Sequence, residues 1–159
     1  MNLKMKTQVK MMSRTRGFEI CSGYSEKAVL PFRGSEGSAG YDFTTVEDIE
    51  IKPFEYCLTF TGIKAYMLKN EVLNMYPRSS LYKKFGVVFT NSVGIIDSDY
   101  YNNSDNEGNI GIMLLNMSKD TVRILAGTRV AQGIFSEYLK ADDDCCSDKR
   151  NGGIGSTGN

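Results

Sequence analysis

Ile110-Gly-Ile-Met-Leu-Leu115 is apolar at its odd and even positions alike. Successive side chains of a β-strand point to opposite faces, so this segment predicts a strand that is covered on both sides. A chain of 159 residues offers one core, and we therefore expect a subunit interface to cover the second face.

The segments on either side of this strand are also short and β-prone. Turn-forming residues separate them, and this spacing favours an all-β sandwich or barrel in a single domain. Ser79–Phe85 is the exception, because Leu81 and Phe85 lie one helical turn apart and predict a short helix. The other strands are expected at Phe18–Cys21, Ala28–Leu30, Tyr41–Thr45, Ile49–Ile51, Tyr56–Phe60, Gly62–Tyr66, Val72–Tyr76, Val87–Phe89, Val93–Ile96, Val122–Leu125 and Arg129–Phe135.

Composition and charge exclude several classes of protein. With 19 basic and 19 acidic side chains, the chain has no overall charge that would attract nucleic acid. It contains no apolar run long enough for a signal peptide or a membrane span. Residues 1–17 are basic and are predicted to form a disordered leader. We expect a cytoplasmic protein with neither a nucleic-acid nor a membrane partner.

Histidine is absent, so acid–base chemistry falls to Asp, Glu, Lys, Tyr or Cys. The four cysteines have no CxxC spacing, and a zinc site without histidine would need all four thiolates. We therefore discount zinc and expect free thiols in a reducing compartment. These cysteines are Cys21, Cys57, Cys145 and Cys146.

The block Val93–Tyr101 carries the strongest chemical signal. An apolar strand ends at Asp97, and Asp99 and Tyr100 follow at once. Burial would move the pKa of such a carboxyl toward neutrality and suit it to act as a general base, while a tyrosine ring beside it can lie against a sugar. The alternative is a hairpin whose Asp/Asn-rich turn, residues 97–106, is merely solvated.

Three further blocks are ambiguous when each is taken alone. Pro77–Leu81 places a guanidinium and two hydroxyls at a helix start and suits an anion, or else Ser79 is a plain N-cap. Gly127–Phe135 is a strand with one guanidinium and one amide, or else a solvated strand face. Gly37–Phe43 is a turn entering a strand, and its Asp42 could orient a neighbouring arginine.

The C-terminal stretch Arg150–Gly158 is rich in glycine and ends in serine and threonine. Such a stretch brings backbone N–H groups and hydroxyls close to an anion. The polar run Lys140–Lys149 before it is typical of a tether. Together they predict a mobile arm that orders over a phosphate ligand, and the alternative is a disordered tail.

Taken in chain order, these blocks resemble the five motifs of the trimeric dUTPase (deoxyuridine triphosphate nucleotidohydrolase) family. The likeness runs from about Phe18 to the C-terminus, and five motifs in order are specific although each one alone is weak. The segments similar to the first to fifth motifs are Ser38–Phe43, Pro77–Leu81, Gly94–Tyr100, Gly127–Gln132 and Gly152–Gly158.

The resemblance implies a jelly-roll-like β-barrel subunit in a homotrimer with an exchanged C-terminal arm, so that each active site is assembled from three chains. It implies hydrolysis of dUTP to dUMP and pyrophosphate with Mg²⁺, which the triphosphate and waters would hold without direct protein ligands. We accordingly divide the chain into the leader 1–17, the barrel domain 18–140, and the tether and arm 141–159.

The resemblance also implies roles for single residues. Asp97 matches the base that activates the water attacking the α-phosphorus. Tyr100 matches the ring that stacks on deoxyribose and excludes a 2′-hydroxyl. The other matches are Asn91 and the backbone near Ile95, Ile96 and Gly111 for the uracil pocket, Arg78, Ser79, Ser80 and Gln132 for phosphate and metal-water contacts, and Arg150, Gly155, Ser156 and Thr157 for the arm that closes on the γ-phosphate.

The chain departs from the family pattern in three places. Ile154 stands where the family usually has a phenylalanine over the uracil, so it would shield the site without stacking. The fifth motif is one residue short, which leaves Arg150 and Lys149 as competing matches for its arginine. Tyr101–Glu107 looks like an insertion in the third motif.

Three alternative functions stay open at this point. The dCTP deaminases share the fold, but they use a glutamate in the region where this chain has Asp97. A dUTP-sensing regulator would use closure of the arm to control a partner protein, with the leader and the insertion as contact surfaces. A structural β-sandwich subunit would not bind dUTP.

Overall fold

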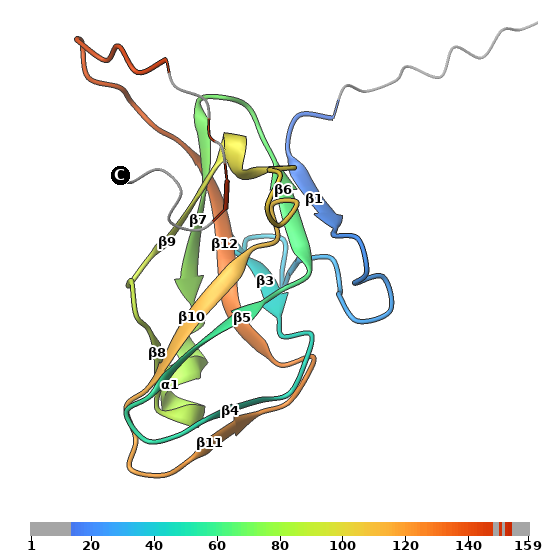
Figure 1. The fold of residues 1–159 in the computed structure, drawn as a ribbon, viewed down its shortest axis with the longest axis vertical. Helices are drawn as coiled ribbons and strands as arrows, with labels where there is room; N and C mark the ends of the chain where they lie inside the picture. Colours follow the sequence, from blue (N-terminus) through green and yellow to red (C-terminus); the bar gives the residue numbers. More distant parts are fainter. Residues whose placement is uncertain (1–13, 148–149, 151, 154–159) are drawn as a thin grey trace, which may run out of the picture.

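The computed structural model describes residues 14–147, 150 and 152–153. They form antiparallel sheets that wrap around one core, with a short helix at one side (Figure 1). The largest sheet has the order β2–β3–β12–β7–β9, and its strands are β2 (Phe32–Arg33), β3 (Tyr41–Thr44), β12 (Arg129–Glu137), β7 (Glu71–Pro77) and β9 (Gly94–Asp97).

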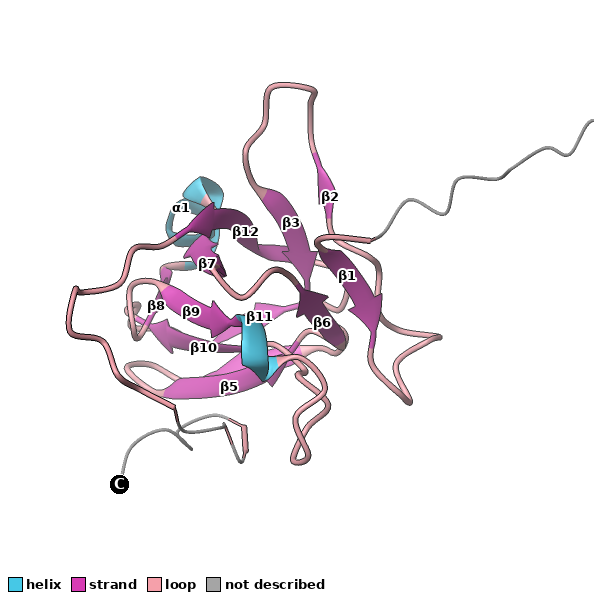
Figure 2. Cartoon of the chain, turned by 90° about the horizontal axis from the view of Figure 1, so that it is seen from above, coloured by secondary structure: helices cyan, strands magenta, loops and turns pink. Residues whose placement is uncertain are grey.

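The second sheet has the order β5–β10–β8, and two strand pairs complete the described strands. Seen from above, the largest sheet and the second sheet lie on different sides of the interior (Figure 2). The second sheet consists of β5 (Tyr56–Phe60), β10 (Gly111–Asn116) and β8 (Val87–Phe89). The pairs are β1 (Gly17–Ile20) with β6 (Ile63–Tyr66) and β11 (Val122–Ile124) with β4 (Ile49–Ile51).

The core lies between these sheets and is closely packed. A Cβ added to Gly133 of β12 would lie 2.8 Å from a ring carbon of Phe43 and 2.9 Å from Leu73 Cδ1, so only glycine fits at that position. The core side chains that are fully buried include Phe43, Ile63, Leu73, Leu81, Ile110, Leu114, Ile124 and Val130.

β10 has one buried and one half-buried face. Ile112, Leu114 and Asn116 are buried, whereas the alternate positions, among them Met113 and Leu115, are only half-buried. The prediction of an apolar strand is confirmed, and its second face lies partly open in the single chain. The cover that we expect from a neighbouring subunit stays a prediction.

The predicted strands are confirmed, with one exception. Ala28–Leu30 is not a strand, because the backbone N–H of Ala28 closes a turn onto the Tyr24 carbonyl (2.8 Å) and Pro31 follows with no N–H to donate. The short strand β2 forms after this proline instead.

The predicted helix is confirmed as α1 (Ser79–Phe85). It ends at Gly86, which has a left-handed φ of 65° and donates its N–H to the Tyr82 carbonyl, as glycine after a helix commonly does. A 3₁₀ turn, η1 (Ser98–Tyr100), was not predicted, and it begins directly after β9.

The first strand begins at Gly17 and not at Phe18. Arg14 forms an ion pair with Glu19, and Arg16 forms one with Glu71 of β7, so the last residues of the expected leader contact the barrel. All four cysteines are free thiols, as predicted. Within the described part of the chain, no helix is long and apolar enough to cross a membrane.

Candidate active site

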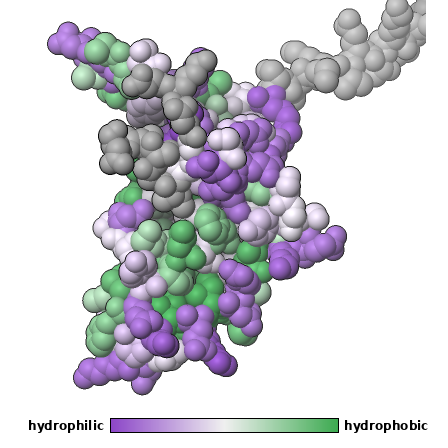
Figure 3. Space-filling model, in the orientation of Figure 1, coloured by the Kyte–Doolittle hydropathy of each residue, from purple (hydrophilic) through white to green (hydrophobic). Residues whose placement is uncertain are grey.

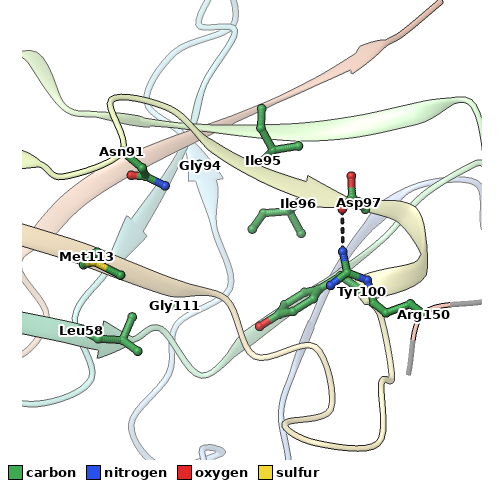
Figure 4. A pocket seen from close by; sticks show the side chains of 10 residues that line it. All are labelled: Leu58, Asn91, Gly94, Ile95, Ile96, Asp97, Tyr100, Gly111, Met113 and Arg150. Carbon is green, nitrogen blue, oxygen red and sulfur yellow. Dashed lines mark hydrogen bonds and ion pairs between the residues drawn. The ribbon is translucent and has the colours of Figure 1, made fainter. Parts of the chain in front are cut away.

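β9 and η1 form the rim of a pocket of about 330 Å³ beside β10 and β5. Figure 4 shows Asn91 and Asp97 at opposite ends of this pocket, with Tyr100 and Arg150 beside the carboxylate. Leu58, Asn91, Gly94, Ile95, Ile96, Asp97, Tyr100, Gly111, Met113 and Arg150 line it. Six residues predicted from the third motif and its neighbours therefore meet here, together with Arg150 of the arm.

The hairpin alternative for this block is wrong. β9 pairs with β7, and β10 pairs with β5 and β8, so β9 and β10 do not form the two arms of a hairpin. Because they belong to different sheets, β9 and β10 leave a hollow between them, which the pocket occupies.

Asp97 is bound by an arginine, and its side chain is not buried. Its Oδ2 accepts a hydrogen bond of 2.6 Å from Arg150, whose Nε also donates to Asp99 Oδ1 at 3.0 Å. The Asp97 side chain is 50% exposed, whereas that of Arg150 is only 9% exposed. The expected burial of Asp97 is therefore wrong, because Asp97 lies on the same face of β9 as the exposed Ile95.

Tyr100 is the buried part of the site, with 6% of its surface exposed. Its hydroxyl donates to the Asn109 carbonyl (3.0 Å) and accepts from Asn106 Nδ2 (2.7 Å). Burial raises the pKa of Tyr100, so the hydroxyl stays protonated and keeps its role as donor at neutral pH. The Arg150 guanidinium carbon lies 5.3 Å from the centre of the ring.

An apolar wall closes the pocket opposite Asp97, and sequence reasoning did not single out its residues. Leu58 of β5 and Met113 of β10 lie directly opposite each other in register. The signal was present, because Met113 belongs to the second apolar face of Ile110–Leu115. At the far end Asn91 belongs to a tight turn in which Ser92 has a positive φ of 61°.

A second cavity, of about 300 Å³, holds residues of the first, second and fourth motifs. Its centre is Asp42, which is 8% exposed, forms an ion pair with Arg78 Nε at 3.1 Å and accepts a hydrogen bond from Arg129 Nη1 at 3.1 Å. The prediction that Asp42 orients an arginine is confirmed. The cavity is lined by Gly34, Ser38, Ala39, Gly40, Asp42, Arg78, Ser79, Arg129, Gln132 and Ile134.

Ser79 is not the N-cap of α1, so that alternative is wrong. Arg78 takes the N-cap position, and no side chain caps the helix, because the Ser79 hydroxyl already belongs to the first turn. Ser79 is exposed at the cavity, whereas Ser80 lines neither of the two cavities.

Gln132 faces the second cavity from β12. Its Nε2 donates weakly to the Pro77 carbonyl at 3.4 Å. A Cβ added to Gly40 would lie 2.5 Å from Gln132 Oε1, so a glycine at this position leaves room for the amide.

The predicted site residues thus fall into two groups within one chain. The pocket at Asp97 and the cavity at Asp42 share no lining residue. Ile154, Gly155, Ser156 and Thr157 lie outside the described residues. In the part of the chain that is described, no cluster of three or more acidic or cysteine side chains could hold a metal ion.

The chain is similar to known proteins in both sequence and fold. A family model described as dUTPase matches residues 26–158. The chain is 47% identical over 148 residues to the deoxyuridine 5′-triphosphate nucleotidohydrolase of Lactococcus lactis subsp. lactis, covering 91% of this chain and 99% of that protein. The crystal structure of a dUTPase from Streptococcus mutans is 46% identical, with a TM-score of 0.77 over 79% of this chain and 98% of the other. A phage phi11 dUTPase of S. aureus shares the fold at 21% identity, with a TM-score of 0.70 over 85% of this chain and 97% of the other.

Proposed function

This chain belongs to the dUTPase family, and we propose that it hydrolyses dUTP to dUMP and pyrophosphate by a water that Asp97 activates for attack on the α-phosphorus. One observation carries the proposal. The Asp97 carboxylate, the Tyr100 ring and the strand backbone at Ile95, Ile96 and Gly111 line a single pocket.

Asp97 suits the role of base because it combines access with a fixed position. Half of its side chain is exposed, so water can reach the carboxylate, and β9 fixes the backbone beside it. A carboxylate base placed in this way supplies about 10²–10⁴-fold in rate. Arg150 now neutralises this carboxylate, so catalysis requires the guanidinium to exchange Asp97 for a phosphate oxygen.

The same pocket would bind the nucleoside. The backbone at Ile95, Ile96 and Gly111, with the Asn91 amide, offers donors and acceptors for uracil. Cytosine would leave some of them unpaired, and unpaired buried groups cost affinity. The Tyr100 ring would stack on the deoxyribose and leave no room for a 2′-hydroxyl.

The second cavity would bind the triphosphate of a nucleotide. Arg78 and Arg129 supply positive charge, and Asp42 keeps their guanidinium groups in place. The donor set fits a Mg²⁺ ion that is held through waters, because the Ser79 hydroxyl and the Gln132 amide can contact metal-bound water. Among the described residues, Asp42 is the one carboxylate that lines this cavity, and it is engaged by arginines. Mg²⁺ on the triphosphate would neutralise charge as pyrophosphate leaves.

The two cavities would meet only in an assembly, and we propose a homotrimer in which one chain supplies Asp97 and another supplies Arg78. The exchanged arm of a third chain would make the contacts at Asp97 and Asp105 that Arg150 and Gly153 make within the single chain. Apolar residues gather over the face of β5, β8 and β10 (Figure 3), with Tyr56, Leu58 and Ile95 exposed. A patch of this kind is typical of an interface. We place the enzyme in the cytoplasm, where the four thiols would stay reduced.

An assay of pyrophosphate release with dUTP, dCTP, dTTP and UTP in the presence of Mg²⁺ tests this function. We expect dUTP to be hydrolysed far faster than the other three nucleotides, and we expect a loss of about 10²–10⁴-fold in kcat for Asp97→Asn. Asp120→Asn, an exposed aspartate in the turn before β11, is the control and should keep the parent rate. Ammonia release from dCTP without pyrophosphate would instead identify a deaminase.

A further inference from the structure

The loop that follows Tyr100, residues 101–108, is tied to the barrel at both of its ends. Glu107 accepts a hydrogen bond of 2.6 Å from Lys64 of β6 and one of 2.9 Å from the backbone N–H of Ser22. The Tyr101 hydroxyl donates to Glu19 of β1 at 2.6 Å. Although burial by itself lowers the pKa of Lys64, the hydrogen bond and charge of Glu107 raise it overall, so this anchor stays charged at neutral pH.

The interior of the loop is held by Asn103. Its Nδ2 donates to the Tyr100 carbonyl and to Asn106 Oδ1, each at 2.8 Å. Its Oδ1 accepts from the backbone N–H groups of Asp105 (3.0 Å) and Asn106 (3.2 Å). The tip of the loop, Asp105–Asn106, therefore has a defined position although the Asp105 side chain is exposed.

This tip touches the two parts of the site that must act together. Asp105 Oδ2 accepts a hydrogen bond of 2.8 Å from the backbone N–H of Gly153, in the arm. Asn106 Nδ2 donates to the Tyr100 hydroxyl at 2.7 Å. A Cβ on Gly153 would also lie 3.4 Å from the Asn106 side chain, so the arm packs directly against both residues.

We propose that the Asp105–Asn106 tip couples docking of the glycine-rich arm to the orientation of Tyr100. Asp105 binds Gly153 of the arm, and Asn106 binds the hydroxyl of the ring against which the sugar would lie. Both are positioning residues, because they act through Gly153 and Tyr100. The kinetic part of this inference rests on the proposed function, whereas the docking part does not.

Docking of the arm is tested by limited trypsin digestion of the full chain without nucleotide. Mass spectrometry follows release of the C-terminal peptide that begins at residue 151. We expect Asp105→Ala to speed this cleavage by roughly three- to tenfold, as loss of one hydrogen bond allows. Asp105→Asn keeps an oxygen acceptor and should stay within about twofold of the parent.

Asp48→Ala is the matched control, because Asp48 also accepts a backbone N–H, that of Ala126 at 2.8 Å, in a turn beside β4 and β11. It should leave the cleavage rate unchanged. Cleavage of Asp105→Ala at the parent rate would overturn the proposal, and so would an equal acceleration by Asp105→Asn. Since no nucleotide is present, neither result depends on dUTP hydrolysis.

The link to Tyr100 is tested by the ratio of kcat/KM for dUTP to that for UTP. Asn106→Ala frees the Tyr100 hydroxyl from one partner, and we expect this ratio to fall by roughly three- to tenfold while the melting temperature changes little. An unchanged ratio in a folded variant would refute the role of Asn106. If the parent protein hydrolyses neither nucleotide, the proposed function fails and the docking result still stands.

Discussion

Asp42 shows how one residue can organise a charged cavity. It is buried, and it forms ion pairs with Arg78 and Arg129, so their guanidinium groups are fixed before a ligand binds. Because fixed groups need no reorganisation on binding, they serve a phosphate better than mobile ones.

We therefore predict that Asp42→Asn lowers kcat/KM for dUTP by about 10–100-fold, because a neutral amide holds two cations more weakly. Steady-state kinetics measures the effect. Glu50→Gln is the matched control, since Glu50 pairs with Arg123 at 2.8 Å but is exposed and lies away from both cavities. Equal losses in both variants would show that Asp42 has no special role at the site.

Asn116 fixes neighbouring parts of the fold by hydrogen bonds, as Asp42 fixes the arginines of the charged cavity by ion pairs. It is fully buried, its Nδ2 donates to the carbonyls of Ile51 (2.9 Å) and Asp120 (2.8 Å), and its Oδ1 accepts from Ser118. One side chain thus joins the end of β10 to β4 and to the turn before β11.

Asn116→Ala should lower the free energy of unfolding by about 2–4 kcal/mol, because it opens a cavity at a fully buried position and removes the amide donor from the buried Ile51 carbonyl. Chemical denaturation measures this change. Asn74→Ala removes an exposed amide that donates to Ser136 Oγ, and it should cost less than about 1 kcal/mol. Similar values for the two variants would contradict the structural role of Asn116.

At the scale of elements, the segment before β1 contacts β7 through an ion pair between Arg16 and Glu71. The Glu71 carboxylate is buried, and it accepts from the Arg16 guanidinium and from the backbone N–H of Leu68 (3.0 Å). The hydrogen bond from Arg16 is the largest cause that lowers the pKa of Glu71 below its ordinary value of 4.5.

A lowered pKa in the folded state gives stability that is present above the unfolded-state pKa and is lost as the pH falls through the folded-state pKa. Below pH 4.5 the melting temperature should therefore fall more steeply with decreasing pH for the parent than for Glu71→Gln. At pH 7 the variant should melt at a lower temperature. Glu36→Gln, which changes an exposed glutamate, should follow the parent curve, and a parallel curve for Glu71→Gln would refute the coupling.

Most elements could be predicted because their signals are local. Short β-prone segments between turn residues predicted the strands, and the spacing of Leu81 and Phe85 predicted α1. The errors arise where β propensity and apolar neighbours do not decide the backbone conformation or the exposure of a side chain. Ala28–Leu30 has β-prone residues but bonds into a turn, and Asp97 ends an apolar strand on the face that it shares with the exposed Ile95. No pattern in the sequence reveals that Asp97 meets Arg150, because the contact joins residues 53 positions apart.

At the scale of the whole molecule, the candidate site is divided. The motifs predicted polar residues of both cavities but not the apolar wall of Leu58 and Met113, and motif order along the chain carries no distance. Within the described residues, Asp97 shares a pocket with Arg150, whereas Arg78 shares a cavity with Asp42. A symmetric assembly can complete such a site, because it can bring the Asp97 pocket of one chain next to the Asp42 cavity of another.

Mixing two inactive variants therefore tests the assembly. Chains with Asp97→Asn and chains with Arg78→Ala, unfolded and refolded together in equal amounts, should regain about a quarter of the parent activity, because about one site in four then receives both intact residues from different chains. A mixture of Asp97→Asn with Tyr100→Ala is the control. These residues belong to one continuous segment, so every site there inherits one defect, and no activity should return. If the first mixture also stays inactive although mixed trimers form, each site would have to belong to a single chain, and the division between the two cavities would need to be closed by a movement within that chain.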